Sequence, residues 1–257
     1  MENKARPYVL AETNYMAIEN EDYTVAVLPW GATEAHNYHL PYGTDNILSE
    51  GVAIEAARLA WNKNAKVIVL PTVPFGVNTG QFDVPFCINM NPSTQLKVIQ
   101  DIVKVLDVNK VNKLVIVNGH GGNNFKQIIR ELSIQFPGVF VCALNWWQAE
   151  NGSDYFNEPG DHAGELETSV VMHLTPELVL PIQEAGNGEA KQFKIKGLKD
   201  GWVTAQRRWT SVTCDTGVGN PKESNKEKGE RFFVATTQAI ASFFVELHNA
   251  DLNNFYE

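Results

Sequence analysis

Short apolar runs recur along the first part of the chain, and stretches with helical spacing separate them. The runs cover residues 23–28, 66–70, 113–118 and 139–144. Each run is nearly continuous rather than alternating, which is typical of strands that are covered on both faces, as in a parallel sheet. We therefore predict four buried strands in these ranges.

Apolar residues between the runs recur every three or four positions, which predicts amphipathic helices. A last stripe predicts a longer helix over about residues 222–249. The stripes are formed by Leu48, Val52, Ala56 and Leu59, by Leu96, Ile99, Val103 and Leu106, by Phe125, Ile128, Ile129 and Leu132, and by Phe233, Ile240, Phe244 and Leu247. Strands that alternate with helices build right-handed βαβ units, so the pattern predicts an α/β fold with a mostly parallel, doubly wound sheet.

Residues 186–221 break this rhythm. They are rich in glycine, lysine and polar residues, with Trp202 and Trp209 embedded among them. We expect an irregular excursion that covers a site or contacts a neighbouring subunit.

Composition narrows the class of protein. A length of 257 residues suits one large α/β domain, and a net charge of −9 argues against binding to nucleic acid or an anionic membrane. No apolar run approaches the ~20 residues that span a membrane, and the opening MENKARPYVLAETNY lacks the apolar core of a signal peptide. The cysteines Cys87, Cys142 and Cys214 are odd in number and far apart, as in reduced proteins, so we expect a cytoplasmic location.

Polar side chains crowd into WGATEAHNYHLPYGTD, residues 30–45, directly after the first apolar run. Glu34 and His36 lie two residues apart and point the same way in an extended chain. Asp45 comes just before the first predicted helix, which either Thr44 or Asp45 is suited to cap. Taken singly these residues fit a polar loop, but together they supply the oxygen and nitrogen ligands that a divalent metal needs.

His120 follows the third apolar run within VNGHGGNN, residues 117–124. One interpretation is a phosphate-binding loop ahead of a helix. The spacing, however, matches neither the dinucleotide pattern nor the P-loop, and no lysine follows at the required place. The interpretation that we favour makes His120 a metal ligand, with the glycines leaving room around it.

A third cluster, DHAGELETS at residues 161–169, opens another predicted helix. Glu167 shares its spacing with the apolar residues Val170, Val171 and Leu174, so it lies on the buried face and needs a cation partner. Glu165 points elsewhere and is the weaker candidate. His162 lies just outside the helix, as a surface or capping residue or as a proton-transfer group.

The candidate ligands are therefore Glu34, His36, Asp45, His120 and Glu167. One zinc ion needs only three or four protein ligands, whereas five, with an aspartate able to bridge, suit two ions about 3.5–4 Å apart. No ligand is a thiolate, so zinc, manganese and iron all suit the set, and zinc is the ion we expect first.

GATEAHNYHLPYGTD, NGHGGN, DHAGELETS and GVGNPKESNKEKGE together resemble the creatininase (creatinine amidohydrolase) family, from about Val25 to Phe244. The resemblance implies a single α/β domain built as a three-layer αβα sandwich, a binuclear metal site and hydrolysis of a C–N bond in a small or cyclic amide. It also implies a homo-oligomer, often a hexamer. The family's metal ligands fall on Glu34, His36, Asp45 and His120, with Asp45 as the bridge.

The chain departs from creatininase proper after the strand-end histidine. That enzyme carries an aromatic residue and then a glutamate ligand, where this chain has Gly121 and Gly122. Glu167 is our candidate for the missing carboxylate. The GHGGN form resembles relatives that include deformylases of formamidopyrimidine intermediates and peptide-trimming members, which argues against creatinine as the substrate.

We therefore predict a metal-dependent amidohydrolase for a small cyclic amide, formamide or related molecule. A metal-bound hydroxide attacks the carbon of the C–N bond, and His162 gives a proton to the leaving nitrogen. His39 supports the site rather than binding metal. Candidates for substrate contact are Trp146, Trp147, Asn123 and Gln81. Two alternatives stay open: a catalytically silent metal-binding member of the family, and a phosphate- or nucleotide-binding enzyme that uses GHGGNN as an anion loop.

Overall fold

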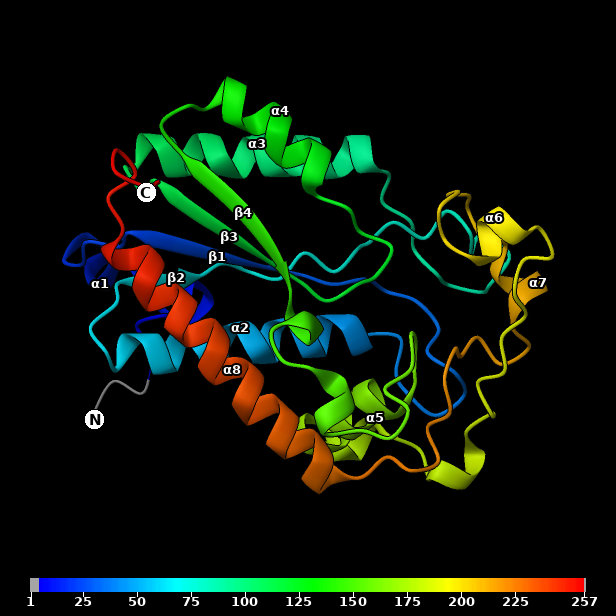
Figure 1. Cartoon of the computed structure of the whole chain (residues 1–257). Helices are drawn as coiled ribbons and strands as arrows, with labels where there is room; N and C mark the ends of the chain where they lie inside the picture. The colour runs from blue at the N-terminus through cyan, green and yellow to red at the C-terminus, as the bar shows by residue number, and fades with distance from the viewer. Residues whose placement is uncertain (1–4, 257) are drawn as a thin grey trace.

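Four parallel strands form the middle layer of the structure, in the order β2-β1-β3-β4 (Figure 1). The computed structural model describes residues 5–256. The strands are β1 (Val25–Trp30), β2 (Val67–Val69), β3 (Lys113–Asn118) and β4 (Phe140–Asn145). All four lie where the apolar runs predict them, and the two central strands are buried along their whole length.

The first strand ends two residues later than expected, because it continues through a proline. Pro29 pairs with Val117 of β3, although proline has no N–H to give to a ladder and is rare inside central strands. Its carbonyl accepts a hydrogen bond from the N–H of Val73 at 3.0 Å. The strand therefore delivers the segment after Trp30 to the carboxyl edge of the sheet.

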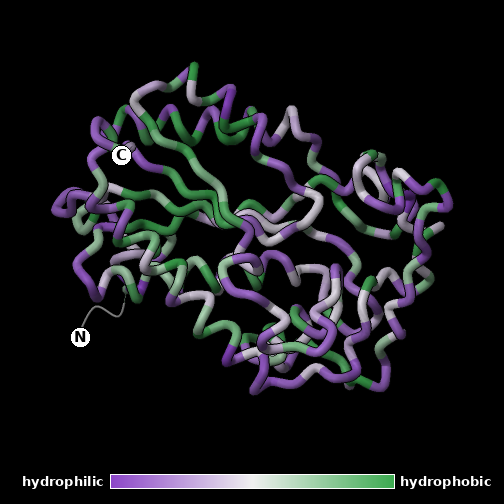
Figure 2. The backbone as a smooth tube through the Cα atoms, in the orientation of Figure 1, coloured by the Kyte–Doolittle hydropathy of each residue, from purple (hydrophilic) through white to green (hydrophobic). Residues whose placement is uncertain are grey.

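Helices cover both faces of the sheet and complete the three-layer αβα arrangement (Figure 1). On one face lie α3 (Pro92–Val108) and α4 (Lys126–Gln135), and on the other lie α2 (Thr44–Trp61), α5 (Glu165–Leu174) and α8 (Lys226–Asn249). Alternate residues of β1 point to opposite faces of the sheet and contribute to the hydrophobic core on each face. Val25 and Val27 pack with α2 and α8, and Ala26 and Leu28 pack with α3 and α4. Figure 2 shows the hydrophobic positions concentrated along the strands.

The last long helix begins four residues later than the apolar stripe suggests. Asn225 caps it, with its side-chain oxygen accepting from the N–H of Lys228 at 2.9 Å. The segment before the cap contains Pro221, so the helix starts only at Lys226. Helix α8 packs against both α2 and α5.

Residues 186–221 contain only two short helices, α6 (Lys196–Lys199) and α7 (Trp209–Val212). They lie at the side of the molecule toward which β1 and β3 run (Figure 1). The remaining short elements are η1 (Leu10–Glu12), α1 (Tyr15–Glu19), η2 (Trp146–Gln148), η3 (Gly152–Asp154), η4 (Pro176–Leu178) and η5 (Ile182–Glu184). No helix within residues 5–256 has the length and apolar character needed to cross a membrane.

Candidate metal centre

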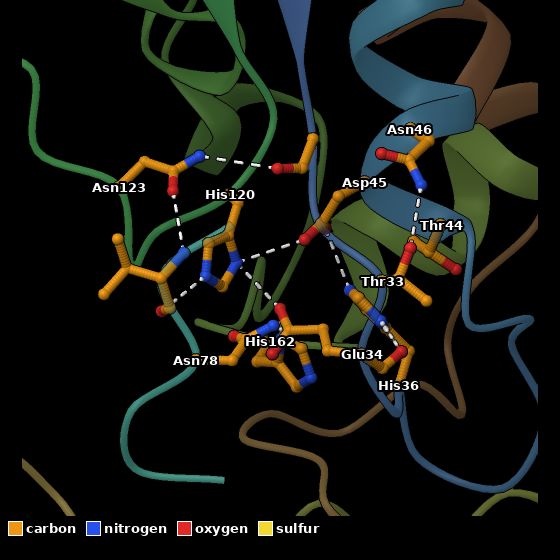
Figure 3. Close-up of polar contacts among 12 residues, drawn as sticks. Thr33, Glu34, His36, Thr44, Asp45, Asn46, Asn78, His120, Asn123 and His162 are labelled. Carbon is orange, nitrogen blue, oxygen red and sulfur yellow. Dashed lines mark hydrogen bonds and ion pairs between the residues drawn. The ribbon is translucent and has the colours of Figure 1, made fainter. Parts of the chain in front are cut away.

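Six titratable side chains converge beyond the carboxyl ends of β1 and β3, where Trp30 lies opposite Asn118. They come from the segment after β1, the first turn of α2, the loop after β3, and the start of α5 with the residues before it. All are buried except Glu167, which is half-buried, and Figure 3 shows five of them gathered at one place. The six are Glu34, His36, Asp45, His120, His162 and Glu167.

The three imidazoles share one arrangement. In each, one ring nitrogen contacts a backbone carbonyl oxygen: Nδ1 of His36 with Glu34 at 3.1 Å, Nε2 of His120 with Val77 at 3.1 Å, and Nε2 of His162 with Ala35 at 2.8 Å. A carbonyl oxygen only accepts, so that nitrogen donates. The other nitrogen of every ring faces the carboxylates, as it does in a histidine that binds metal.

The carboxylates are held from outside and face inward with free oxygens. Gln81 donates to Oε2 of Glu34, and the N–H of Ala163 donates to Oε2 of Glu167 at 2.6 Å. Oε1 of Glu34 and Oδ2 of Asp45 are buried and form no hydrogen bond among the described residues. Both lie beside the single nitrogen Nδ1 of His120, at 2.8 and 3.1 Å. One ring nitrogen carries at most one N–H and does not satisfy both buried oxygens, so their negative charge is costly unless a further cation offsets it.

Electrostatics within the cluster draw protons onto the rings. Burial by itself lowers the pKa of His36, but the charge and hydrogen bond of Asp45 outweigh it and the pKa rises to about 10. In the same way Glu34 and Asp45 overcome burial and raise the pKa of His120. The pKa of Glu34 is lowered despite its burial, because His120 and His162 face it, whereas burial raises the pKa of Glu167. The cluster thus favours positive charge at its centre, which divalent ions also supply.

The ligand atoms divide into triads that suit metal ions. Glu34, Asp45 and His120 form one group, and His36, Asp45 and Glu167 form another, with the ligand atoms in each group lying within 4.8 Å of one another. The two groups share Asp45, whose Oδ1 faces His36 and whose Oδ2 faces His120. Nitrogen and carboxylate donors with unpaired inner oxygens therefore fit two divalent ions with Asp45 between them.

A sequence model of the creatininase family, described as creatinine amidohydrolase, matches residues 11–244. The chain belongs to the creatininase family. Two curated relatives are named for different reactions. A mycofactocin precursor peptide peptidase from Mycolicibacterium smegmatis is 25% identical over 224 residues, which is 84% of this chain and 83% of that protein. A creatinine amidohydrolase from Pseudomonas putida is 25% identical over 184 residues, covering 60% and 66%.

Solved creatininase-family structures share the fold. A crystal structure of a protein from Bacteroides fragilis NCTC 9343, provisionally named a creatinine amidohydrolase, is 43% identical and covers 100% of both chains, with a TM-score of 0.92. A glutamate-to-glutamine mutant of creatininase in a Zn-Zn form is 22% identical, with a TM-score of 0.78, and covers 96% of this chain and 100% of that chain.

A third triad brings in His162, which the sequence assigns to proton transfer. Glu34, His36 and His162 also place their ligand atoms within 4.8 Å of one another. The ring of His162 lies against that of His36, with centroids 4.1 Å apart, and its Nδ1 is 3.8 Å from Oε1 of Glu34. The position of His162 therefore suits both a metal ligand and a proton-transfer group.

Glu165 and Glu167, two residues apart on α5, face different partners. Glu165 is buried but bonds Nζ of Lys228 at 2.5 Å and the N–H of Glu158 at 3.0 Å, away from the triads. Glu167 joins His36 and Asp45. Glu167 is therefore placed to supply a carboxylate to the cluster. Gly122, which stands where creatininase proper has a glutamate, supplies none.

The glycines of the GHGGN sequence have unequal roles. A Cβ at Gly122 would lie 2.4 Å from Nε2 of His120 and 2.4 Å from the carbonyl oxygen of Val77, so no side chain fits there without moving the histidine. A Cβ at Gly121 would meet nothing within 4 Å. Gly122 therefore lets His120 donate to Val77, and this contact excludes a creatininase-like glutamate at the same position.

His39 is buried outside the triads. Its Nε2 contacts Oγ1 of Thr168 on α5 at 2.9 Å. Burial and the neighbouring charge of His36 lower its pKa to about 4. A neutral ring bonded to α5 supports the helix that carries Glu167.

A cavity of about 520 Å³ opens onto the metal centre. Trp147 and Gln81 line it, as expected for substrate contacts, although Gln81 is also bonded to Glu34. The structure places Trp146 elsewhere: its ring is 1% exposed and packs on Phe232 in the core. Asn123 also lies behind the wall, where its Oδ1 accepts from Val77 and Gln95.

Another part of the cavity wall comes from residues 186–221, the segment expected to cover a site or contact a neighbouring subunit, although the sequence assigned none of its residues a role in the site. Residues 204–207 and Trp209, from the irregular segment, line the cavity opposite the strand ends. The only local signal is the stretch QRRW, which places arginines next to an aromatic residue in a polar segment. Its location depends on contacts with residues far away in the sequence.

Proposed function

We propose that this chain is a binuclear metallo-amidohydrolase that cleaves a C–N bond in a small molecule. The observation that carries the proposal is the common arrangement of His36, His120 and His162. Each ring is fixed by a backbone carbonyl on its outer side and turns its second nitrogen toward carboxylate oxygens, of which Oε1 of Glu34 and Oδ2 of Asp45 form no hydrogen bond among the described residues. In metal-binding histidines one ring nitrogen donates to an outer acceptor while the other binds the metal, and the three rings here are arranged in the same way.

Glu34 and His120 would hold one ion, His36 and Glu167 the other, and Asp45 would contact both. Bound there, divalent ions supply a Lewis acid for a carbonyl oxygen and acidify water toward neutral pH. Creatininase itself is known in a Zn-Zn form and in a manganese form, which supports zinc or manganese for this chain.

The remaining residues of the centre position substrate and move a proton. His162 lines the cavity, and its Nε2 is tied to Ala35, so a proton carried on Nδ1 points toward Glu34 and the reaction centre. We assign it the protonation of the leaving nitrogen. Trp147 and Leu166 give the cavity an apolar wall against which a small amide packs.

Metal analysis tests the centre directly. Protein purified without chelator should contain close to two divalent ions per chain. A protein without metal, and without binding on titration with zinc or manganese, would overturn the proposal. His162→Ala separates the two roles of that residue. If His162 is a proton donor, the variant keeps the metal stoichiometry and loses about 10²–10⁴-fold in turnover. If His162 is a ligand, the variant binds less metal.

A second substrate class is favoured by one comparison. The curated peptidase aligns with 84% of this chain, so peptide trimming is a second candidate reaction besides the hydrolysis of a compact amide. A screen of the metal-loaded protein against creatinine, formamides, cyclic amides and short peptides distinguishes the two. Release of an amino acid from peptides alone would favour the peptidase reaction.

We also propose that the chain assembles with copies of itself in the cytoplasm. Support comes from Phe82 and Phe86, which are 73% and 87% exposed on the loop after Gln81. Exposed neighbouring aromatic residues are typical of contact surfaces. Sedimentation velocity on the purified protein measures the size, with a hexamer as the expected species and a monomer as the contrary result.

A further inference from the structure

Arg207 lines the same cavity as the metal centre and is open to solvent. Its side chain is 40% exposed. The guanidinium lies over the ring of Trp209, 4.8 Å from the ring centroid, and Nη2 donates to Oδ2 of Asp161 at 3.1 Å. Stacking on an aromatic face fixes the plane of a guanidinium and suits it to planar anions.

A column of rings connects this guanidinium with the metal centre. Trp209 meets His162 edge to face, with centroids 5.4 Å apart, and His162 lies against His36 at 4.1 Å. Arg207 is thus placed on the outer end of a packed series that ends at a candidate metal ligand. A molecule that lay along this series would have one end at the candidate metal centre and the other at Arg207.

The backbone around Arg207 is held in place by the opposite wall. The N–H of Trp209 donates to the carbonyl of Gly80 at 2.9 Å, and its indole N–H donates to Thr216 at 3.0 Å. A Cβ at Gly80 would lie 2.2 Å from the carbonyl oxygen of Arg207, so the two segments are in direct contact. The position of Arg207 is therefore fixed by the fold.

Arg207 is a positively charged side chain in a cavity wall that also carries negative charges. Four carboxylates line the cavity, from Glu34, Asp45, Asp161 and Glu167, whereas Arg207 is the one lysine or arginine in the wall among residues 5–256. A guanidinium has five N–H donors, and within those residues only the contact with Asp161 uses its side-chain donors. A second carboxylate can therefore bind in the bidentate manner that arginine favours.

We propose that Arg207 binds a carboxylate of the substrate, so that the substrate is an amide with a free carboxylate remote from the scissile bond. The inference rests on the proposed function for the reacting end of the molecule. Asp161 holds the guanidinium in place until the substrate carboxylate joins or replaces it. The cavity then selects acids over neutral amides of the same size.

Hippurate and hippuramide test this selection, because they differ only in whether the end group is a carboxylate or an amide. Isothermal titration of the protein as purified should show hippurate binding about tenfold tighter or more, as expected for a charge-assisted bidentate pair. Arg207→Gln should abolish this preference. Arg208→Gln is the matched control, since Arg208 is 77% exposed, pairs with Asp83 and lies outside this cavity wall.

Each outcome bears on the inference. Equal binding of acid and amide in every probe pair by the unmodified protein overturns it, and so does a preference that survives Arg207→Gln, because the carboxylate then binds elsewhere. N-acetyl-triglycine and its C-terminal amide extend the test to peptide ends, and a preference that depends on Arg207 in either pair supports the inference. A protein that binds hippurate through Arg207 but holds no metal and cleaves no amide refutes the proposed function alone.

Discussion

The side-chain amide of Gln81 donates a hydrogen bond to Oε2 of Glu34, and both side chains are buried. The thiol of Cys87 donates to the amide oxygen of Gln81, with Sγ and Oε1 3.2 Å apart, which sets the end of the amide that faces Glu34. Gln81 thereby leaves Oε1 of Glu34 turned toward His120. Such outer contacts orient metal ligands and influence their affinity.

Replacing Gln81 by leucine removes this contact while keeping the side-chain volume similar. We expect Gln81→Leu to weaken metal binding by about 10–100-fold, because Oε2 of Glu34 is left buried without a donor. Competition with a chromogenic chelator measures the affinity. Gln238→Leu, at an exposed position on α8, is the control and should bind metal normally. An unchanged affinity in the first variant would show that Gln81 does not position Glu34.

The two glycines after His120 should respond differently to a methyl group. Gly122→Ala places Cβ against Nε2 of His120 and the carbonyl of Val77, so the ring must move from its position beside Glu34 and Asp45. We expect metal affinity to fall by about tenfold or more. Gly121→Ala has open space and should leave metal binding unaltered. Equal effects in the two variants, measured by the same chelator competition, would contradict this account.

Glutamine substitutions distinguish the two glutamates of α5. Glu167→Gln should reduce the bound metal from two ions toward one, as measured by elemental analysis, with little loss of stability. Glu165→Gln should keep both ions but lower the free energy of unfolding by about 1–3 kcal/mol, since Lys228 loses its charged partner. Urea unfolding of the metal-free proteins measures that loss. The reverse pattern would make Glu165 the ligand.

The cysteines should differ in reactivity. Burial raises the pKa of Cys142 to about 12, so that at pH 8 only about one thiol in ten thousand is ionised. Cys214 is exposed. We expect a disulfide reagent to modify Cys214 rapidly in the folded protein and Cys142 far more slowly. Because the pKa is raised, the slow reaction of Cys142 should accelerate as the pH increases. Loss of the fast phase in Cys214→Ser identifies it.

Much of the fold could be predicted because its determinants are local. The central strands are buried on both faces, so their apolar runs are continuous, and β3 has the bounds that the run predicts. The end of β1 was missed because proline normally stops a central strand, and the start of α8 was missed because the Asn225 cap overrides the apolar stripe.

The candidate site was predictable only in part. Glu34, His36, Asp45 and His120 follow strand ends that parallel pairing brings together, so their convergence follows from the topology. Arg207 and Trp209 lie in a segment without periodicity, and their location is set by contacts with Gly80 and Asp161. Trp146 and Trp147 are adjacent, yet one faces the core and the other the cavity, a choice that depends on Phe232 of α8.

Helix α5 packs against both α2 and α8, and α8 is the last helix of the chain to be synthesised. A growing chain contains one triad once His120 has left the ribosome, but the second waits for Glu167. Helix α5 then stays uncovered until Lys226–Asn249 has been synthesised. The residues of the two triads therefore emerge from the ribosome at different times, and the helix that packs against α5 emerges last. We therefore expect any metal at the second triad to be bound firmly only after α8 has been synthesised and has packed against α5.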